Sequence, residues 1–267
     1  MSKRSSVPAR VPRSLPRGKS PLPRNIVLLS QRGRLIEATA RAVAAKGYAA
    51  TTVADITRIA GVSRTTFYQQ FKDKEDCFLS CYEEEAELHL AMVMEAGEAQ
   101  RDLMQRFIAW QRRYLEALDQ EPDYAKAYFL ESLYAGERAM ARRRRHGEQY
   151  ATLYRDWFQA LQALHPTLAD PPPVVFELAV IGASELVAER IRLGHTGQLT
   201  ETLLEPLLLL HLPLLLVMHA IGRPLSFTHA YFESVSGLTT TGATVLAELD
   251  RLPLSVNMWR TFMQWIG

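Results

Sequence analysis

The chain has little cysteine: among its 267 residues only Cys77 and Cys81 carry a thiol. Two thiols cannot form the disulfide framework of a small secreted domain, and without a histidine nearby they make a poor zinc site. We therefore expect two buried, reduced thiols in a cytoplasmic protein. Redox or metal sensing is the less favoured alternative.

The chain also lacks the motifs of common enzymes. It has no glycine-rich phosphate loop, no His-Glu-x-x-His zinc motif and no nucleophile elbow, and its seven histidines are scattered. We therefore expect neither an enzyme nor a metal site nor a resident cofactor. A helical enzyme is kept only as a competing class.

Strong net charge is missing as well, because 31 Lys and Arg nearly balance 29 Asp and Glu and leave a formal charge of +2. Binding to nucleic acid would therefore rest on local basic clusters. The clearest cluster is residues 1–24, which hold seven Lys or Arg, five Pro and no acidic residue. This composition predicts a disordered basic arm, which either supplements phosphate binding or is an inert leader.

A helix-turn-helix pattern is the most informative feature that is present, at residues 51–74. Thr52 and Asp55 stand three apart, as in a capping box that opens a first helix. Gly61 follows the last apolar residue of that helix, where the chain must take a left-handed backbone conformation. The spacing predicts two short helices joined by a glycine turn. An ordinary surface hairpin is the alternative.

The second helix of this pattern has one aromatic face and several polar ones. Ser63 is placed to cap it, and Phe67 and Phe71 lie four apart on the inward face. On the other faces, arginine can pair with guanine, glutamine with adenine, and a threonine methyl group can contact thymine. The predicted DNA-binding residues are Thr52, Ser63, Arg64, Thr65, Thr66, Tyr68, Gln69, Gln70, Lys72 and Lys74.

Residues 32–74 resemble the N-terminal domain of the tetracycline-repressor (TetR) family of bacterial transcription regulators. The resemblance includes the sequence KGY that closes the first helix at residues 46–48, and Thr52 at the start of the second. It also includes Tyr68 and Lys74, at positions where that family commonly contacts DNA phosphates.

The resemblance extends over about residues 30–205 and implies a homodimer whose DNA-binding heads respond to a small molecule. Gln70 stands where many relatives carry histidine, so the operator sequence does not transfer. The expected partners are double-stranded DNA, a small-molecule effector of unknown identity and a second copy of the chain, without a membrane.

Residues 75–206 read as successive helices, with prolines near the expected breaks. Aromatic residues recur along them at helical spacing, which usually indicates a core. The family resemblance implies that some of them line a ligand pocket instead. The candidates are Phe107, Trp110, Tyr114, Tyr128, Tyr154, Trp157 and Phe158.

Two further segments of this helical region carry competing interpretations. The four arginines at 142–145 suit a solvated helix face better than an anion site or a second DNA contact. Residues 174–195 carry small and apolar side chains that suit either a dimer interface or burial within the monomer. The resemblance implies the dimer, because TetR-like proteins pair through their last two helices.

The tail, residues 207–267, departs from that family. Its apolar run at 207–221 is interrupted by Pro213 and is shorter than the roughly 20 residues needed to cross a bilayer. Residues 222–267 resemble the first pore loop of TrkH-type bacterial potassium transporters, with TTTGAT at 239–244 where that family places its selectivity-filter glycine. A working filter surrounds the ion with four such loops, so we interpret this tail as a fused fragment of uncertain structure.

The sequence as a whole predicts an all-α protein. We expect a disordered arm (1–24), a three-helix DNA-binding domain (25–74), a helical ligand-binding and dimerisation domain (75–206) and an apolar tail (207–267). The predicted function is a ligand-released repressor that binds a pseudo-palindromic operator as a homodimer. The alternative is a membrane-associated protein related to potassium transport, or a regulator tethered to the membrane through residues 207–267.

Overall fold

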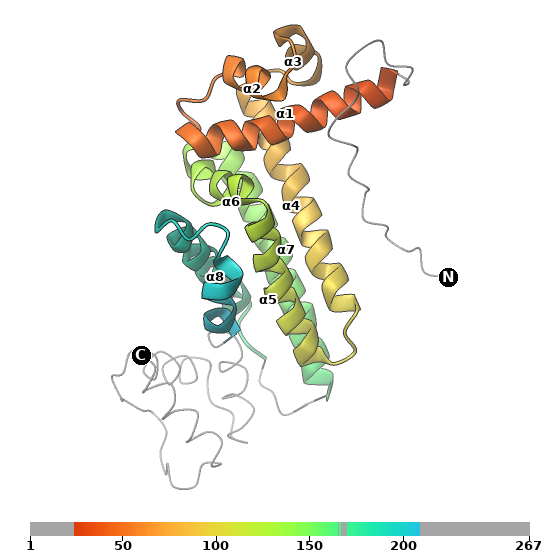
Figure 1. Cartoon of the computed structure of the whole chain (residues 1–267). Helices are drawn as coiled ribbons and strands as arrows, with labels where there is room; N and C mark the ends of the chain where they lie inside the picture. Colours follow the sequence, from red (N-terminus) through yellow and green to blue (C-terminus); the bar gives the residue numbers. More distant parts are fainter. Residues whose placement is uncertain (1–23, 165, 167–169, 209–267) are drawn as a thin grey trace. The chain divides into compact units, whose positions relative to one another are not determined.

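The computed structural model describes residues 24–164, 166 and 170–208. Within these ranges the regular secondary structure is helical and no strand occurs, so the predicted all-α class is confirmed. The elements in Figure 1 are α1 (Arg24–Lys46), α2 (Val53–Ala60), α3 (Arg64–Gln70), α4 (Lys74–Glu98), α5 (Leu103–Gln120), α6 (Pro122–Phe129), η1 (Glu131–Tyr134), α7 (Glu137–Leu164) and α8 (Val174–Arg192). Residues 199–208 are also helical. The predicted arm, except its last residue, and the tail from residue 209 onward lie outside the described residues.

The chain divides into two compact units. Among the described residues, the first unit contains 24–150 and 183–203, and the second contains 151–164, 166, 170–182 and 204–208. Helices α7 and α8 therefore contribute to both units. The domain boundary predicted after residue 74 falls inside the first unit, at the first residue of α4, and the domain limits stay a prediction.

Helices α1 to α3 form a small head with its own apolar core in the first unit. Leu35 and Ile36 of α1 pack with Ile56 of α2 and with Phe67 and Phe71 of the α3 region. Each of these side chains is at most 5% exposed, and burial of one such side chain contributes about 1.5–3 kcal/mol. The head is thus held by side chains from three helices, of which α2 and α3 are too short to be stable alone.

The two cysteines of α4 complete this core, as the sequence predicts. Cys77 and Cys81 are free and buried, and Cys77 Sγ lies 3.1 Å from Thr39 Oγ1. Burial raises the pKa of Cys77 to about 12. A thiol that stays protonated at neutral pH is a poor nucleophile, so these cysteines act as core residues.

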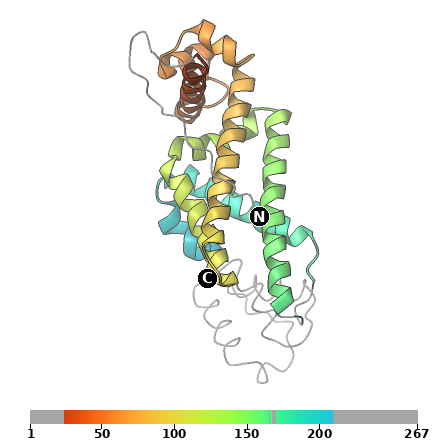
Figure 2. The ribbon, with the colours of Figure 1, turned by 90° about the vertical axis from the view of Figure 1, so that its right-hand side faces the viewer.

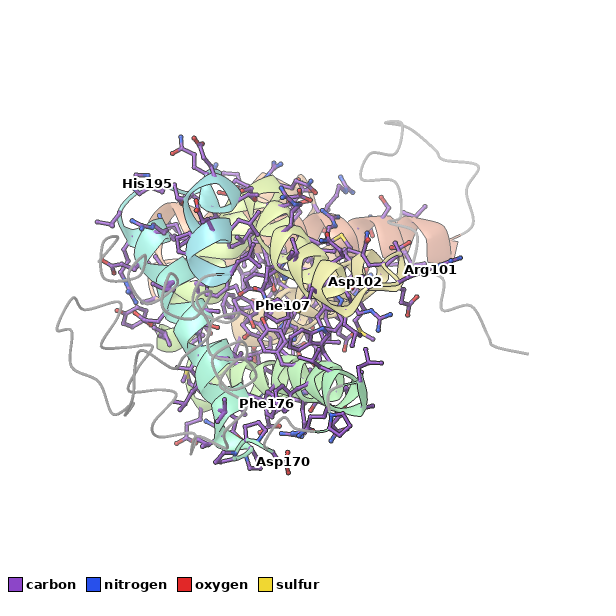
Figure 3. All side chains as sticks on the ribbon, turned by 90° about the horizontal axis from the view of Figure 1, so that it is seen from below. Arg101, Asp102, Phe107, Asp170, Phe176 and His195 are labelled. Carbon is purple, nitrogen blue, oxygen red and sulfur yellow. The ribbon has the colours of Figure 1, made fainter. Side chains whose placement is uncertain are left out.

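The rest of the first unit is built on α4, which leaves the head, and on α5, which returns beside it (Figures 1 and 2). Asp102, which is labelled in Figure 3, caps α5 by accepting a hydrogen bond from the Gln105 N–H group (2.8 Å). Five residues after Asp102, Phe107 is 2% exposed among the packed side chains of this interior.

Helix α6 packs against α1 and connects the head to the helices beyond it. A second apolar cluster joins Val43 of α1 with Phe78 of α4, Ala127 of α6 and Ala139 of α7. The ring of Tyr48, in the α1–α2 turn, packs against this cluster. The base of the head therefore shares a core with α4, α6 and the start of α7.

Candidate nucleic-acid interface and buried polar cluster

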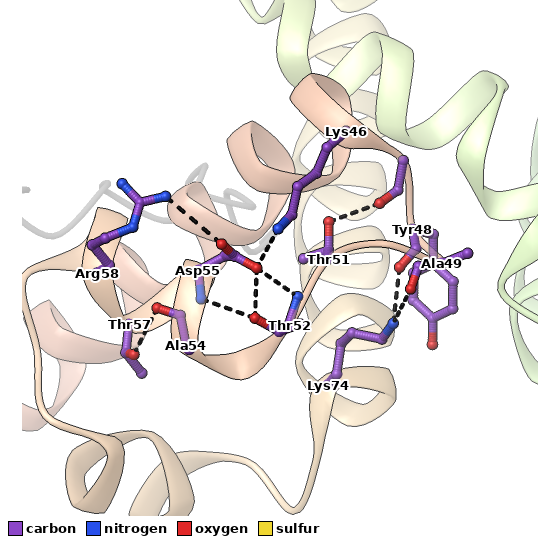
Figure 4. Close-up of polar contacts among 11 residues, drawn as sticks. Lys46, Tyr48, Ala49, Thr51, Thr52, Ala54, Asp55, Thr57, Arg58 and Lys74 are labelled. Atoms are coloured by element: carbon purple, nitrogen blue, oxygen red, sulfur yellow. Dashed lines mark hydrogen bonds and ion pairs between the residues drawn. The ribbon is translucent and has the colours of Figure 1, made fainter.

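Thr52 and Asp55 form the predicted capping box at the start of α2 (Figure 4). The Asp55 N–H group donates to Thr52 Oγ1 (3.3 Å), and the Thr52 N–H group donates to Asp55 Oδ2 (3.0 Å). Asp55 is also ion-paired with Lys46, and this contact lowers the pKa of the Asp55 carboxyl well below its usual range. The Thr52 hydroxyl, predicted to hold the DNA backbone, donates to Asp55 Oδ2.

The predicted turn between α2 and α3 is also confirmed. Gly61 has φ 64° and ψ 38°, the left-handed conformation that glycine adopts at low cost. The Val62 N–H group donates to the Thr57 carbonyl (3.1 Å). Ser63 then caps α3 by accepting a hydrogen bond from the Thr66 N–H group (3.0 Å). These local contacts set the direction in which α3 leaves the turn.

Phe67 and Phe71 hold one face of α3 against the head. Their ring centroids are 5.7 Å apart, and Phe67 is fully buried. The remaining side chains of α3 therefore project outward or sideways. The exposed ones are Arg64, Thr65, Tyr68 and Gln69, whereas Thr66 and Gln70 are half-buried. Gln70 Nε2 donates to the Leu28 carbonyl of α1 at a long 3.4 Å.

The two lysines predicted to bind phosphates differ in their surroundings. Lys72 is exposed. Lys74 Nζ donates to the Tyr48 carbonyl (2.8 Å) and lies 4.3 Å from the centre of the Tyr48 ring (Figure 4). Burial lowers the pKa of Lys74. Lys74 thus ties the first residue of α4 to the α1–α2 turn, a structural role that no local pattern predicted.

Tyr48 also connects the head to the helices beyond it. Its N–H group donates to Glu131 Oε2 (2.8 Å), at the start of η1. Its ring lies 4.9 Å from that of Phe78 in α4. Glu131 is 83 residues away in sequence, and no local pattern pointed to it. The α1–α2 turn is thus bonded to α4 through Lys74 and to η1 through Glu131.

The four arginines at 142–145 are only partly a solvated face. Arg142 Nε and Arg145 Nη2 lie 3.3 Å and 2.5 Å from the Glu83 carboxylate of α4. Arg143 extends over the Tyr128 and Phe129 rings, about 6 Å from each centroid. These contacts fasten α7 to α4 and α6. Arg144 is exposed, as expected for a solvated position.

The candidate pocket aromatics are mostly buried. In the first unit Phe107, Trp110 and Tyr128 are at most 9% exposed, and Tyr114 is half-buried. In the second unit Tyr154, Trp157 and Phe158 are buried, and Phe158 packs against Phe176, also in that unit, with ring centroids 5.8 Å apart. The division into two units therefore separates the seven candidates into a group of four and a group of three. Their assignment to a ligand pocket stays a prediction.

The first unit contains two buried histidines that the sequence patterns did not single out. His89 Nε2 lies 2.9 Å from the Tyr114 carbonyl, and His146 packs edge-on against the Tyr128 ring. Burial lowers the pKa of each histidine to about 4. The two histidines interact electrostatically and lie among the rings of Tyr114, Tyr128 and Tyr150. The period of α4 offered a signal for His89, because buried Ala86 and Val93 lie three and four residues away.

Two other kinds of site are missing from the described ranges. Residues 24–164, 166 and 170–208 contain no group of three His, Cys, Asp or Glu side chains placed to hold a metal ion. In the same ranges no helix is both long and apolar enough to span a bilayer.

The head matches a known family. Residues 35–81 fit the family model described as bacterial regulatory proteins, tetR family. This stretch contains the capping box, the glycine turn, α3 and the first part of α4. The head of this chain is thus similar to the N-terminal domain of that family.

Solved structures show that the fold extends well beyond the head. The chain is similar to the fatty acid degradation regulator FadR from Bacillus halodurans, with a TM-score of 0.58, 17% identity, and coverage of 67% of this chain and 94% of that one. FadR from Bacillus subtilis, solved in complex with stearoyl-CoA, has a TM-score of 0.58 and 18% identity over 66% of this chain and 96% of that one. A putative TetR-family regulator from Syntrophomonas wolfei has a TM-score of 0.58 and 19% identity over 70% of this chain and 95% of that one. The chain thus has the fold of a TetR-family transcriptional regulator.

A short stretch of the chain is similar to potassium uptake proteins. It is 56% identical over 43 residues to TrkH from Vibrio parahaemolyticus, covering 16% of this chain and 9% of TrkH. It is 50% identical over 48 residues to TrkI from Halomonas elongata, covering 18% of this chain and 10% of TrkI. The chain spans about a tenth of the length of these relatives. The length of the match is consistent with the pore-loop resemblance of residues 222–267.

Proposed function

We propose that this chain is a ligand-released repressor that binds a pseudo-palindromic operator as a homodimer in the cytoplasm. The observation that carries the proposal is the arrangement of α3: it is capped by Ser63, held inward by Phe67 and Phe71, and exposes Arg64 and Tyr68. A short helix presented in this way can enter the DNA major groove, whose base edges distinguish all four base pairs.

The side chains of α3 divide into two proposed roles. Arg64 and Thr65, exposed in the first turn, contact base edges, and Tyr68, which is 59% exposed, contacts a phosphate. Thr66 and Gln70 are half-buried, so they reach DNA only at the edge of the interface. Base contacts determine sequence preference, whereas phosphate contacts position the head.

A homodimer would place two copies of α3 on successive major grooves. Support comes from α8, where three apolar side chains remain exposed at helical spacing: Val174, Leu178 and Ile181 are 48%, 50% and 62% exposed. An apolar stripe of this kind on a single chain is typical of a surface that a partner covers. This stripe lies within the predicted interface of residues 174–195.

The effector site belongs to the helical region. In the first unit, Tyr114 and Tyr128 supply apolar area, while His89 and His146 supply polar atoms that can orient a ligand. We propose an apolar or amphipathic effector there. Such a ligand releases DNA only if it binds the DNA-free conformation more tightly than the DNA-bound one. A molecule that binds by calorimetry but leaves operator affinity unchanged is therefore not the effector.

Arg64→Ala should relax discrimination at one base position of the operator by about 1–3 kcal/mol, because a bidentate contact to a base edge is lost. Lys74→Ala should weaken binding to all DNA sequences to a similar degree, because one phosphate contact is lost. It should also reduce the slope of log K against log salt concentration by about one. Gel-shift titrations of matched operator variants at several salt concentrations measure both effects. Arg112→Ala, at an exposed position of α5, is the control. Parent-like binding by both test variants would exclude this assignment.

A second candidate function rests on the similarity to potassium uptake proteins. It would make the chain a membrane-associated relative of those transporters, or a regulator tethered through residues 207–267. A single pore loop cannot surround an ion, since a filter uses four. We therefore favour the repressor function. Its predicted DNA-binding residues all lie from Thr52 to Lys74, outside the segment that resembles the transporters.

Deleting residues 222–267 should leave operator binding and dimerisation within about twofold of the parent, because the deleted segment contains none of the proposed contacts. Gel-shift titration and sedimentation measure the two properties. Loss of operator binding by the soluble truncated protein would make the tail part of the regulator. Potassium flux through vesicles that contain the full chain would favour the transport function instead.

A further inference from the structure

Tyr48, in the α1–α2 turn, is held from outside the head at both of its backbone polar groups. Its N–H group donates to Glu131 Oε2 of η1 (2.8 Å), and its carbonyl accepts a hydrogen bond from Lys74 Nζ of α4 (2.8 Å). Its ring lies 4.9 Å from the ring of Phe78, also in α4. Two elements that follow the head in sequence therefore fix the same residue of the turn.

The turn in turn holds the start of α2 (Figure 4). The Gly47 carbonyl accepts hydrogen bonds from the Thr51 N–H group (3.2 Å) and from Thr51 Oγ1 (2.8 Å). Thr52, the next residue, caps α2 together with Asp55, which is ion-paired with Lys46 at the end of α1. A shift of the turn would therefore displace α2, and with it α3, which begins four residues after α2 ends.

The carboxylate of Glu131 is placed against the turn by features on both sides of the contact. Gly47 has φ 84°, and a β-carbon there would lie only 3.2 Å from Glu131 Oε2, so glycine leaves the space that the carboxylate uses. On the other side, the fully buried Ser132 donates from Oγ to the Tyr128 carbonyl, which anchors the start of η1 to α6. The hydrogen-bond acceptor is thus supplied by a fixed segment.

The charge of Glu131 by itself does not favour DNA binding. A carboxylate repels DNA phosphates, whereas a hydrogen bond that holds the head in one orientation favours binding. A head that is already oriented loses less conformational freedom when it meets DNA, so its affinity is higher. Removing the carboxylate therefore has two opposite effects, and the sign of the change in affinity shows which one prevails.

We propose that Glu131 is a positioning residue for operator binding. Its carboxylate holds the Tyr48 N–H group and thereby fixes the orientation of α2 and α3, without touching DNA. This inference rests on the proposed function, because operator binding is one of its two readouts. The second readout, hydrogen exchange in the head, needs no DNA.

The first test compares a duplex that the full-length parent selects from a random-sequence pool with an unselected duplex of the same length. Glu131→Ala should weaken binding to the selected duplex about fivefold. Binding to the unselected duplex should stay within about twofold, and the slope of log K against log salt concentration should not change, because no phosphate contact is lost. Glu137→Ala, at an exposed position in the first turn of α7, removes the same charge and should bind both duplexes like the parent.

Two conservative variants separate the hydrogen bond from the charge. Glu131→Gln removes the charge but keeps an oxygen that can accept from the Tyr48 N–H group, so it should recover most of the preference for the selected duplex. Glu131→Asp keeps the charge but retracts the carboxylate by one methylene group, so it should behave like Glu131→Ala. The reverse order, with aspartate normal and glutamine impaired, would overturn the role of this hydrogen bond.

Amide hydrogen exchange of the DNA-free full chain is the second test. In Glu131→Ala the Tyr48 amide should exchange at least about tenfold faster than in the parent, and the amides of α2 and α3 should also exchange faster. The amides of α5 should exchange as in the parent. Faster exchange at Tyr48 alone, with an unchanged preference for the selected duplex, would show that Glu131 merely satisfies one N–H group of the turn. That result would overturn the proposal.

The two tests also separate this inference from the proposed function. A parent chain that selects no duplex would reject the proposed function, whereas exchange in α2 and α3 would still decide whether Glu131 fixes the head. A parent that selects a duplex, with a Glu131→Ala variant that binds it equally well, would reject only the positioning role.

Discussion

Gly97→Ala should lower the free energy of unfolding by about 3 kcal/mol, a large effect for one methyl group. A β-carbon at Gly97 would overlap Trp110 Nε1 and come within 2.7 Å of the Cδ1 and Cε2 atoms of the same ring. Trp110 is 6% exposed, so the ring has little room to move. Helices α4 and α5 would have to separate at this point. Urea unfolding followed by circular dichroism measures the change.

Gly33→Ala is the matched control, because it introduces the same methyl group into another helix, α1. No atom lies within 4 Å of the added carbon there. The control should stabilise the protein by about 0.5–1 kcal/mol, since alanine favours the helix over glycine. Trp110→Phe removes the part of the indole that meets Gly97, so the double variant should recover part of the loss. Parent-like stability of Gly97→Ala would contradict this close packing of Trp110 on Gly97.

Acid should destabilise the protein steeply between pH 6.5 and pH 4. Burial lowers the pKa of both His89 and His146 from 6.5 to about 4. Because the folded pKa lies below the unfolded one, the unfolded chain takes up protons first as the pH falls. The stability is therefore fully present above about pH 6.5 and is lost towards pH 4. Each lowering of a histidine pKa corresponds to a loss of about 3 kcal/mol in the free energy of unfolding once the pH is below both pKa values.

The double variant His89→Gln and His146→Gln tests this origin. Glutamine has no proton to gain in this range, and at position 89 its amide can still donate to the Tyr114 carbonyl. The free energy of unfolding of the double variant should fall far less between pH 6.5 and pH 4.5 than that of the parent. The difference between the unfolding free energies of parent and double variant at pH 7.5 measures the packing cost of the substitutions separately. Equal pH slopes for parent and double variant would rule out these histidines as the cause.

The head could be predicted because its signals are local. Thr52 and Asp55 are three residues apart, and Gly61 and Ser63 act on backbone groups within a few positions. Phe67 and Phe71 share a face because they are one helical turn apart. Caps, glycine turns and helical periodicity depend on short stretches of chain, so they remain visible in the sequence.

The role of Lys74 was not visible in the same way. Its position predicts a contact with DNA phosphate, which stays a prediction, and it gave no sign that the ammonium group also bonds to the Tyr48 carbonyl, 26 residues away. Glu131, 83 residues from Tyr48, carried no sequence signal at all. The arginines at 142–145 suggested a solvated face, and two of them instead pair with Glu83, about 60 residues away.

The sequence by itself determined the helical class, the capped helix-turn-helix and the polar outer face of α3, because each depends on residues a few positions apart. Only the tertiary structure decided that Tyr48 links the head to α4 and η1, that His89 and His146 are buried, and that Arg142 and Arg145 pair with Glu83. These features depend on how helices distant in sequence pack against one another. Packing is governed by the fit of whole side-chain surfaces, which no short pattern of residues records.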